Sequence, residues 1–132
     1  MPRKLRGLSI SYDAYKELEY FCYQYGEKKK ELTFLYGGRG LRMDAAGKGT
    51  RQTDQTAATA FRAMVLEEQV GMIEEAAKEA GQQLAPFLLK NVTEKMKYEY
   101  MEVPCGRRQF YAMRRLFFEI LYQKKKKVEM GH

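Results

Sequence analysis

The segment from residue 103 to residue 121, VPCGRRQFYAMRRLFFEIL, constrains the fold most, because a helix breaker stands directly before a long helical pattern. Pro104 and Gly106 both oppose the continuation of a helix. After them, apolar residues recur at the spacing of an amphipathic helix, which predicts a helix from about residue 106 to residue 126. One side of this helix is apolar and is predicted to face the core: Phe110, Met113, Phe117, Ile120 and Leu121.

The opposite side of the same helix is positively charged. At 100° per residue, Arg108, Ala112 and Arg115 fall on one stripe, and small Ala112 leaves room for a close approach to a groove. An apolar back and an arginine-rich front are typical of a recognition helix, whose first turn points at base edges. Glu119 continues the stripe and would repel phosphate, so DNA contact is expected to end before it. The predicted DNA-binding residues are Arg107, Arg108, Gln109, Tyr111, Ala112 and Arg115.

The same helix also fits a second interpretation. Tyr111, Phe118 and Tyr122 form a second aromatic stripe, as expected for a helix that is covered on most sides, for instance in a dimer. In that case the arginines would lie along apolar surface or pair with acidic residues of the segment 53–81.

The remaining periodic segments also predict helices, so the expected fold class is all-α. Residues 1–36 are predicted to hold one long N-terminal helix, which Ser11 caps and Gly26 weakens. Its buried seam is expected to include Tyr15, Leu18 and Cys22. Residues 37–52 contain five glycines without periodicity and are predicted to be a flexible linker.

Residues 53–81 are predicted to form a long acidic amphipathic helix, capped by Thr53 or Asp54 and ended by Gly81. Its glutamates are expected to form a solvated face. Its expected apolar stripe consists of Phe61, Val65, Met72, Ile73, Ala76 and Ala80.

Residues 82–132 are predicted to form a tri-helical unit with a basic tail. A helix near 85–95, with Pro86 in its first turn, precedes a short helix near 97–102 and the arginine-rich helix from 106. This order is the layout of a helix-turn-helix.

Charge is distributed unevenly along the chain, whose formal net charge is +7. Residues 1–52 carry +5, residues 53–81 carry −4 and residues 82–132 carry +6. Two basic ends beside an acidic segment favour a polyanionic partner, most often nucleic acid. The alternative is a lysine-rich solvated surface without a specific partner.

The sequence offers little for catalysis, so we expect no enzyme, no metal site and no cofactor. The only cysteines, Cys22 and Cys105, are far apart, and the only histidine is His132 at the end of the chain. We interpret both cysteines as small core or interface residues. The segment from Gly47 to Thr50 lacks the spacing of a phosphate loop. Without a membrane span or signal peptide in the sequence, we expect an intracellular protein.

Two segments, YKELEYFCYQYGEKKKEL and LLKNVTEKMKYEYMEVPCGRRQFYAMRRLFFEIL, resemble small prophage proteins of Gram-positive bacteria described as RinA- or ArpU-type transcriptional regulators of late phage genes. The C-terminal part is similar in layout to sigma factor region 4. The resemblance implies an activator that binds DNA through Arg107, Arg108, Tyr111 and Arg115. It also implies the cytoplasm of a bacterial host cell, near the nucleoid, as its location. The glycine usual in the turn of such a motif is missing, since Val103, Pro104 and Cys105 occupy that region.

The sequence therefore predicts a DNA-binding transcriptional regulator of phage or prophage genes. Its expected partners are double-stranded DNA, with RNA polymerase and a second copy of the chain as candidates, the latter through the N-terminal and 53–81 helices. Alternatives are a phage packaging protein of the small-terminase type and a helical interaction or structural protein that binds no DNA.

Overall fold

The computed structural model describes residues 9–37 and 53–131. Within these ranges the protein is all-helical, without a β-strand, which confirms the predicted class. The chain forms two compact units. The first comprises Met1–Tyr25 and Met72–His132, and the second comprises Gly26–Gly71. The predicted linker lies outside the described residues, except for Gly37, which belongs to a helix.

The predicted long N-terminal helix is two helices, α1 (Tyr12–Tyr23) and α2 (Tyr25–Gly37). As predicted, Ser11 caps α1, and its Oγ accepts a hydrogen bond from the Ala14 N–H at 3.1 Å. The prediction of one helix was wrong because a turn at Gln24 separates the two helices. The Gln24 N–H donates to the carbonyl of Phe21, three residues earlier, at 3.3 Å. A weak helix former, Gly26, follows this turn directly.

Helix α3 (Thr53–Gly81) has the predicted bounds, but its buried stripe differs. Met72, Ile73 and Ala76 are buried as predicted, whereas Phe61 is 65% exposed. In the second unit α3 instead buries Ala63, Leu66 and Val70. The buried stripe runs through Leu66, Val70, Ile73 and Ala77, at alternating steps of four and three residues, and Met72 and Ala76 widen it in the first unit. The cap predicted at Thr53 or Asp54 involves side chains outside the described residues.

The end of α3 also differs in detail from the expected glycine cap. Gly81 keeps a right-handed conformation, and the residue with positive φ is Gln82, at 50°. A 3-10 turn, Gln82–Leu84, then leads into α4 (Ala85–Glu94). Pro86 lies in the first turn of α4 as predicted, while Leu88 and Val92 are fully buried.

The last helix, α5 (Arg107–Gly131), begins after the predicted break and extends beyond the predicted end. Its predicted core face is largely confirmed, since Phe110, Phe117 and Leu121 are fully buried and Met113 and Ile120 partly. Phe118, on the second aromatic stripe of the alternative interpretation, is also fully buried, as expected for a helix covered on more than one side. The reason is α1, whose Tyr15 ring meets the Phe118 ring edge-on at 5.0 Å between centroids.

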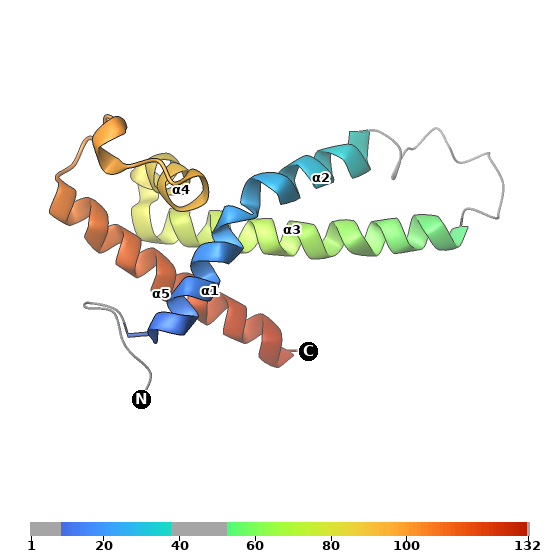
Figure 1. Cartoon of the computed structure of the whole chain (residues 1–132). Coiled ribbons are helices and arrows are strands. Elements are labelled where there is room, and N and C mark those ends of the chain that lie inside the picture. The colour runs from blue at the N-terminus through green and yellow to red at the C-terminus, as the bar shows by residue number, and fades with distance from the viewer. Residues whose placement is uncertain (1–8, 38–52, 132) are drawn as a thin grey trace. The chain divides into compact units, whose positions relative to one another are not determined.

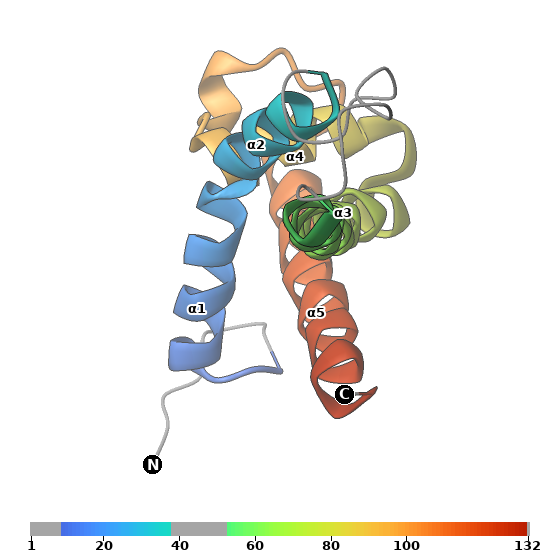
Figure 2. The same cartoon turned by 90° about the vertical axis from the view of Figure 1, so that its right-hand side faces the viewer.

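The core of the first unit lies among four helices. Helix α1 packs against both α4 and α5, and α4 packs against α5 (Figures 1 and 2). The C-terminal part of α3 contributes small and aliphatic side chains to the same core. The completely buried members of this core are Cys22, Ile73, Ala76, Ala77, Leu88, Val92, Phe110, Phe117, Phe118 and Leu121.

The second unit is a helical hairpin of α2 and the first part of α3. Arg62 of α3 donates two hydrogen bonds to Glu31 of α2, at 2.9 and 3.1 Å. The Tyr36 hydroxyl donates to Glu67 Oε2 at 2.6 Å. No residue of α2 is fully buried, so this hairpin has a much thinner core than the first unit. The glutamates of α3 are therefore partly engaged rather than a simple solvated face.

Candidate nucleic-acid interface

The candidate interface is the first half of α5, where the predicted DNA-binding residues cluster. Phe110 and Phe117 anchor this part of the helix in the core. On the opposite side, Arg108, Gln109 and Ala112 are exposed, and Arg115 is partly exposed. The helix therefore presents an open row of a guanidinium, a methyl group and a second guanidinium to solvent.

Neither Arg108 nor Arg115 has an ion-pair or hydrogen-bond partner among the described residues. An unpaired guanidinium offers planar donors that match phosphate oxygens or a guanine edge. The guanidinium groups of this row are thus free to meet an anionic ligand.

Arg107 is placed differently from the other predicted residues. Its guanidinium pairs with Glu99 at 2.7 Å and lies 5.6 Å from the centroid of the Tyr98 ring and 6.0 Å from that of Tyr111. The hydrogen bond from Arg107 lowers the pKa of Glu99, and the same contact raises the pKa of Arg107. Both side chains are half exposed, so a phosphate would have to compete with Glu99 for this arginine.

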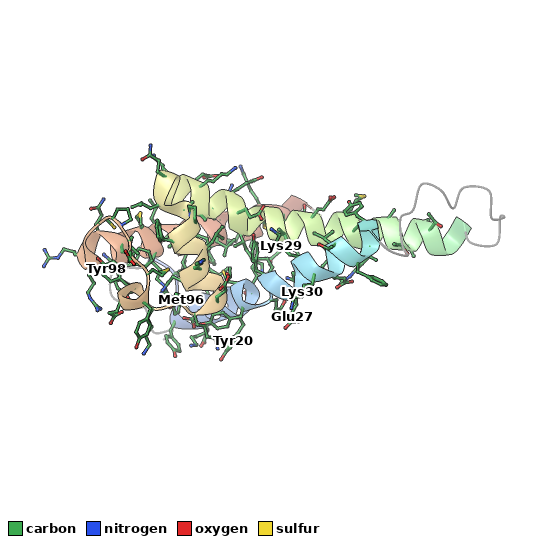
Figure 3. The ribbon with its side chains drawn as sticks, turned by 90° about the horizontal axis from the view of Figure 1, so that it is seen from above. Tyr20, Glu27, Lys29, Lys30, Met96 and Tyr98 are labelled. Atoms are coloured by element: carbon green, nitrogen blue, oxygen red, sulfur yellow. The ribbon has the colours of Figure 1, made fainter. Side chains whose placement is uncertain are left out.

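The connection between α4 and α5 fixes the start of the candidate interface. The predicted short helix over 97–102 is only a 3-10 turn, Tyr98–Tyr100. Figure 3 shows Met96 and Tyr98 on this connection. The Tyr98 hydroxyl donates to the Cys105 carbonyl at 2.5 Å. The Tyr98 ring packs on the Phe110 ring, with 5.4 Å between the ring centroids. The turn is short because Tyr98 ties it back to the residues directly before α5.

Arg114, next to the open row, belongs to the interior of the first unit. Its Nε donates to Asn91 Oδ1 at 2.7 Å, and its Nη1 donates to the Tyr15 hydroxyl at 2.8 Å. Its Nη2 lies 3.4 Å from Glu19 Oε2, and its guanidinium carbon lies 4.9 Å from the centroid of the Phe118 ring. Arg114 thereby joins α1, α4 and α5 and is a positioning residue for the interface.

Sequence reasoning did not single out this role for Arg114. The available signal was its position four residues after Phe110 and four before Phe118, close to the buried side. The alternative in which arginines pair internally holds for Arg114, but with Glu19 of α1 and not with acids of the 53–81 helix.

Glu19 is the buried acid of this cluster. It accepts hydrogen bonds from Tyr15 at 2.8 Å and from Lys16 at 2.9 Å. Burial by itself raises the pKa of Glu19, but the hydrogen bonds from Lys16 and Tyr15 and the charges of Lys16 and Arg114 outweigh it and hold this pKa below its ordinary value. The cluster is therefore stable in its charged form.

Asn91 connects the Arg114 cluster to the turn after α4. Its Nδ2 donates to the Met96 carbonyl at 2.9 Å while its Oδ1 accepts from Arg114. In this turn Lys95 has a left-handed conformation, with φ of 61°. Its Nζ lies 4.4 Å from the centroid of the Tyr23 ring on α1. A change at Asn91 would therefore disturb the turn and α5 together.

In the second half of α5, Lys124 and Lys125 contact other helices, whereas Lys126 and Lys127 are exposed. Lys124 pairs with Glu79 at 2.7 Å and with Glu75 at 3.4 Å, both on α3. The Nζ of Lys125 lies over the Phe21 ring at 4.4 Å. Glu119 accepts a hydrogen bond from the Ser9 N–H at 3.2 Å, so the open row ends at an acid, as its spacing suggested.

The described residues contain no group of three or more His, Cys, Asp or Glu side chains that could hold a metal ion. Both cysteines are free thiols, with Cys22 buried in the core and Cys105 half-buried. No described helix is both long enough and apolar enough to cross a membrane.

Comparison with protein-family models, with curated proteins and with solved structures finds no match for this chain.

Proposed function

We propose that this protein binds duplex DNA through the first half of α5 and regulates transcription of phage or prophage genes. The observation that carries the proposal is the open row of Arg108, Ala112 and Arg115 on a helix whose opposite side is anchored in the core by fully buried residues, Phe110, Phe117 and Leu121. A rigid helix with unpaired guanidinium groups suits the major groove, where arginine bonds guanine or phosphate.

The contacts within the row have distinct expected roles. Arg108 and Gln109 lie in the first turns of α5, so they are expected to reach base edges. Arg115, two turns further along, is expected to bond a phosphate oxygen. Ala112 lies between the two arginines and allows the helix to approach closely. Arg107 and Tyr111 are expected to contact the backbone beside the groove, with Arg107 exchanging Glu99 for phosphate.

The proposed biological context rests on the sequence segments that resemble RinA- and ArpU-type regulators. The 3-10 turn at Tyr98–Tyr100 takes the place of the second helix of a helix-turn-helix, so α5 is proposed to dock with support from α4 and α1. Direct contact with RNA polymerase is part of the same proposal and would be tested by co-purification with and without promoter DNA.

Selection of bound fragments from random duplex DNA tests the proposed function most directly. Enrichment of one motif supports a sequence-specific regulator. Equal retention of all fragments, with an affinity that falls steeply with salt, would indicate a nonspecific binder such as a packaging protein. No binding at low salt contradicts the proposal. The matched control is the double variant R108A/R115A, which should fold normally and lose the enrichment.

A second candidate function, a helical interaction protein, is favoured by a specific observation. Arg107, Arg114 and Lys124 are all paired within the chain, so part of the positive charge of α5 is not available to DNA. This candidate predicts that R108A/R115A has no effect on any nucleic-acid binding.

A further inference from the structure

The outer side of α3 in the second unit carries an apolar face that no described residue covers. Phe61 is 65% exposed and Met64 is 63% exposed. These side chains point away from α2, because the residues that α3 buries in this unit, Ala63 and Leu66, lie on the other side of the helix.

This face follows a coiled-coil spacing. Ala57, Phe61, Met64, Glu68 and Gly71 are separated by alternating steps of four and three residues, which places them on one seam of the helix. Ala57 and Glu68 are exposed, and a Cβ added at Gly71 would meet no atom within 4 Å. The seam is thus an open strip with small residues at its ends and large ones in the middle.

From this pattern we infer that α3 forms an antiparallel homodimer through the outer seam of the second unit. Ala57 and Gly71 lie seven residues before and after Met64. A two-fold axis at Met64 therefore brings Ala57 against Gly71 of the second copy and Met64 against Met64 of the second copy. Met64 meets its own copy at the centre, the ring of Phe61 lies beside Glu68 of the second copy, and the small residues at the ends leave room for the two backbones to approach.

Charge decides between the two directions of pairing. In a parallel pair, Glu68 would face Glu68 of the second copy across the seam, where like charges repel. In the antiparallel pair the two carboxylates lie on opposite sides of the axis, about 12 Å apart along the helix at 1.5 Å per residue. The seam has no other ionised residue, so the antiparallel pair leaves no charge facing its like.

A second copy suits this face because the hairpin is thin. Two helices with few buried residues need another layer to cover their remaining apolar side, and two hairpins together make a four-helix arrangement. The seam spans about 22 Å of helix at 1.5 Å per residue, which offers less than the roughly 800 Å² per partner of a standard interface. We therefore expect a weak dimer that dissociates on dilution. The inference does not depend on DNA binding.

Sedimentation of the full chain over a range of micromolar concentrations tests the dimer. The wild-type protein should change from monomer to dimer as its concentration rises, and Met64→Glu should remain a monomer with unchanged helix content by circular dichroism. The matched control is Tyr100→Glu, which places the same charge on a 75% exposed residue of the first unit and should still dimerise. A wild-type monomer throughout the range, or a dimer of Met64→Glu, overturns the inference.

Spin-label distances test the direction of pairing without a destabilising charge. Labels are attached to single cysteines at positions 57, 64 and 71 in a Cys105→Ser background, where Cys22 is buried and protected. The antiparallel dimer predicts a short distance between labels at 64 and distances about 20 Å longer along the axis at 57 and at 71. Equal distances at all three positions would mean a parallel pair and overturn the arrangement.

The dimer and the DNA binding are measured separately, so their failures can be told apart. A monomer that binds DNA contradicts only this inference, and a dimer without DNA binding contradicts only the proposed function.

Discussion

The two sides of α5 use the same residue type in opposite ways. Arg114 is 80% covered and bonds Asn91, Tyr15 and Glu19, whereas its neighbour Arg115 is partly exposed and unpaired among the described residues. Adjacent residues in a helix differ by 100°, which is enough to move a guanidinium from the core to the surface. The number of arginines in α5 therefore overstates the charge available to DNA, because Arg114 uses its guanidinium to bind α5 to α1 and α4.

The largest expected effect lies on the buried side. Phe117→Ala should lower the free energy of unfolding by about 3–5 kcal/mol, because a completely buried ring leaves a cavity. Leu116→Ala is the matched control, since Leu116 is 44% exposed and should cost far less. Urea denaturation of both variants measures the difference. Equal losses for the two would mean that α5 is rotated from the described orientation.

The next comparison is between the neighbouring arginines. Arg114→Ala should destabilise the protein by about 2–3 kcal/mol, because it removes charged hydrogen bonds from a largely buried cluster. Arg115→Ala should change stability by no more than about 0.5 kcal/mol, as surface substitutions do. Urea denaturation curves measure the loss of unfolding free energy in each variant. A larger loss for Arg115→Ala than for Arg114→Ala would contradict the assignment of Arg114 to the buried side.

Acid pH should weaken the buried side through Glu19. The pKa of Glu19 in the folded protein lies below its ordinary value, so its contribution is fully present above that ordinary value. The contribution is lost as pH falls through the lower, folded-state pKa. The difference in unfolding free energy between wild type and Glu19→Gln should therefore shrink as the medium becomes more acidic. Glu31→Gln, in the exposed pair with Arg62, is the control and should show a smaller pH-dependent difference.

The smallest stability effects, and the largest proposed effects on binding, belong to the open side. Arg108→Ala should leave stability nearly unchanged but weaken binding to the preferred DNA site by about 1–3 kcal/mol. Arg115→Ala should weaken binding to all sequences alike and reduce the dependence of log affinity on log salt by about one unit. Fluorescence anisotropy at several salt concentrations measures both.

Glu119→Ala tests where the proposed DNA-contacting side of α5 ends. The carboxylate continues the arginine stripe, so its removal should leave DNA affinity unchanged or increase it, because repulsion of phosphate is lost. A clear loss of affinity, with stability preserved, would mean that the contact surface reaches past Arg115 along α5.

The sequence by itself determined where helices begin and end in several places. Pro104 and Gly106 stand directly before the start of α5 at Arg107, Ser11 caps α1, and α3 has its predicted bounds. These features depend on neighbouring residues, whose backbone preferences act locally. The core positions Phe110 and Phe117 follow from helical spacing for the same reason.

Only the tertiary structure decided which side chains of these helices are covered. Phe118 and Arg114 are buried because α1, about 100 residues earlier in the chain, supplies Tyr15 and Glu19 to cover them. Phe61 lies in the predicted apolar stripe but is exposed, since the buried stripe of α3 runs through Leu66, Val70 and Ile73 on another side of the helix. Periodicity identifies the faces of a helix, but the partners that cover each face come from distant segments and are not encoded in local spacing.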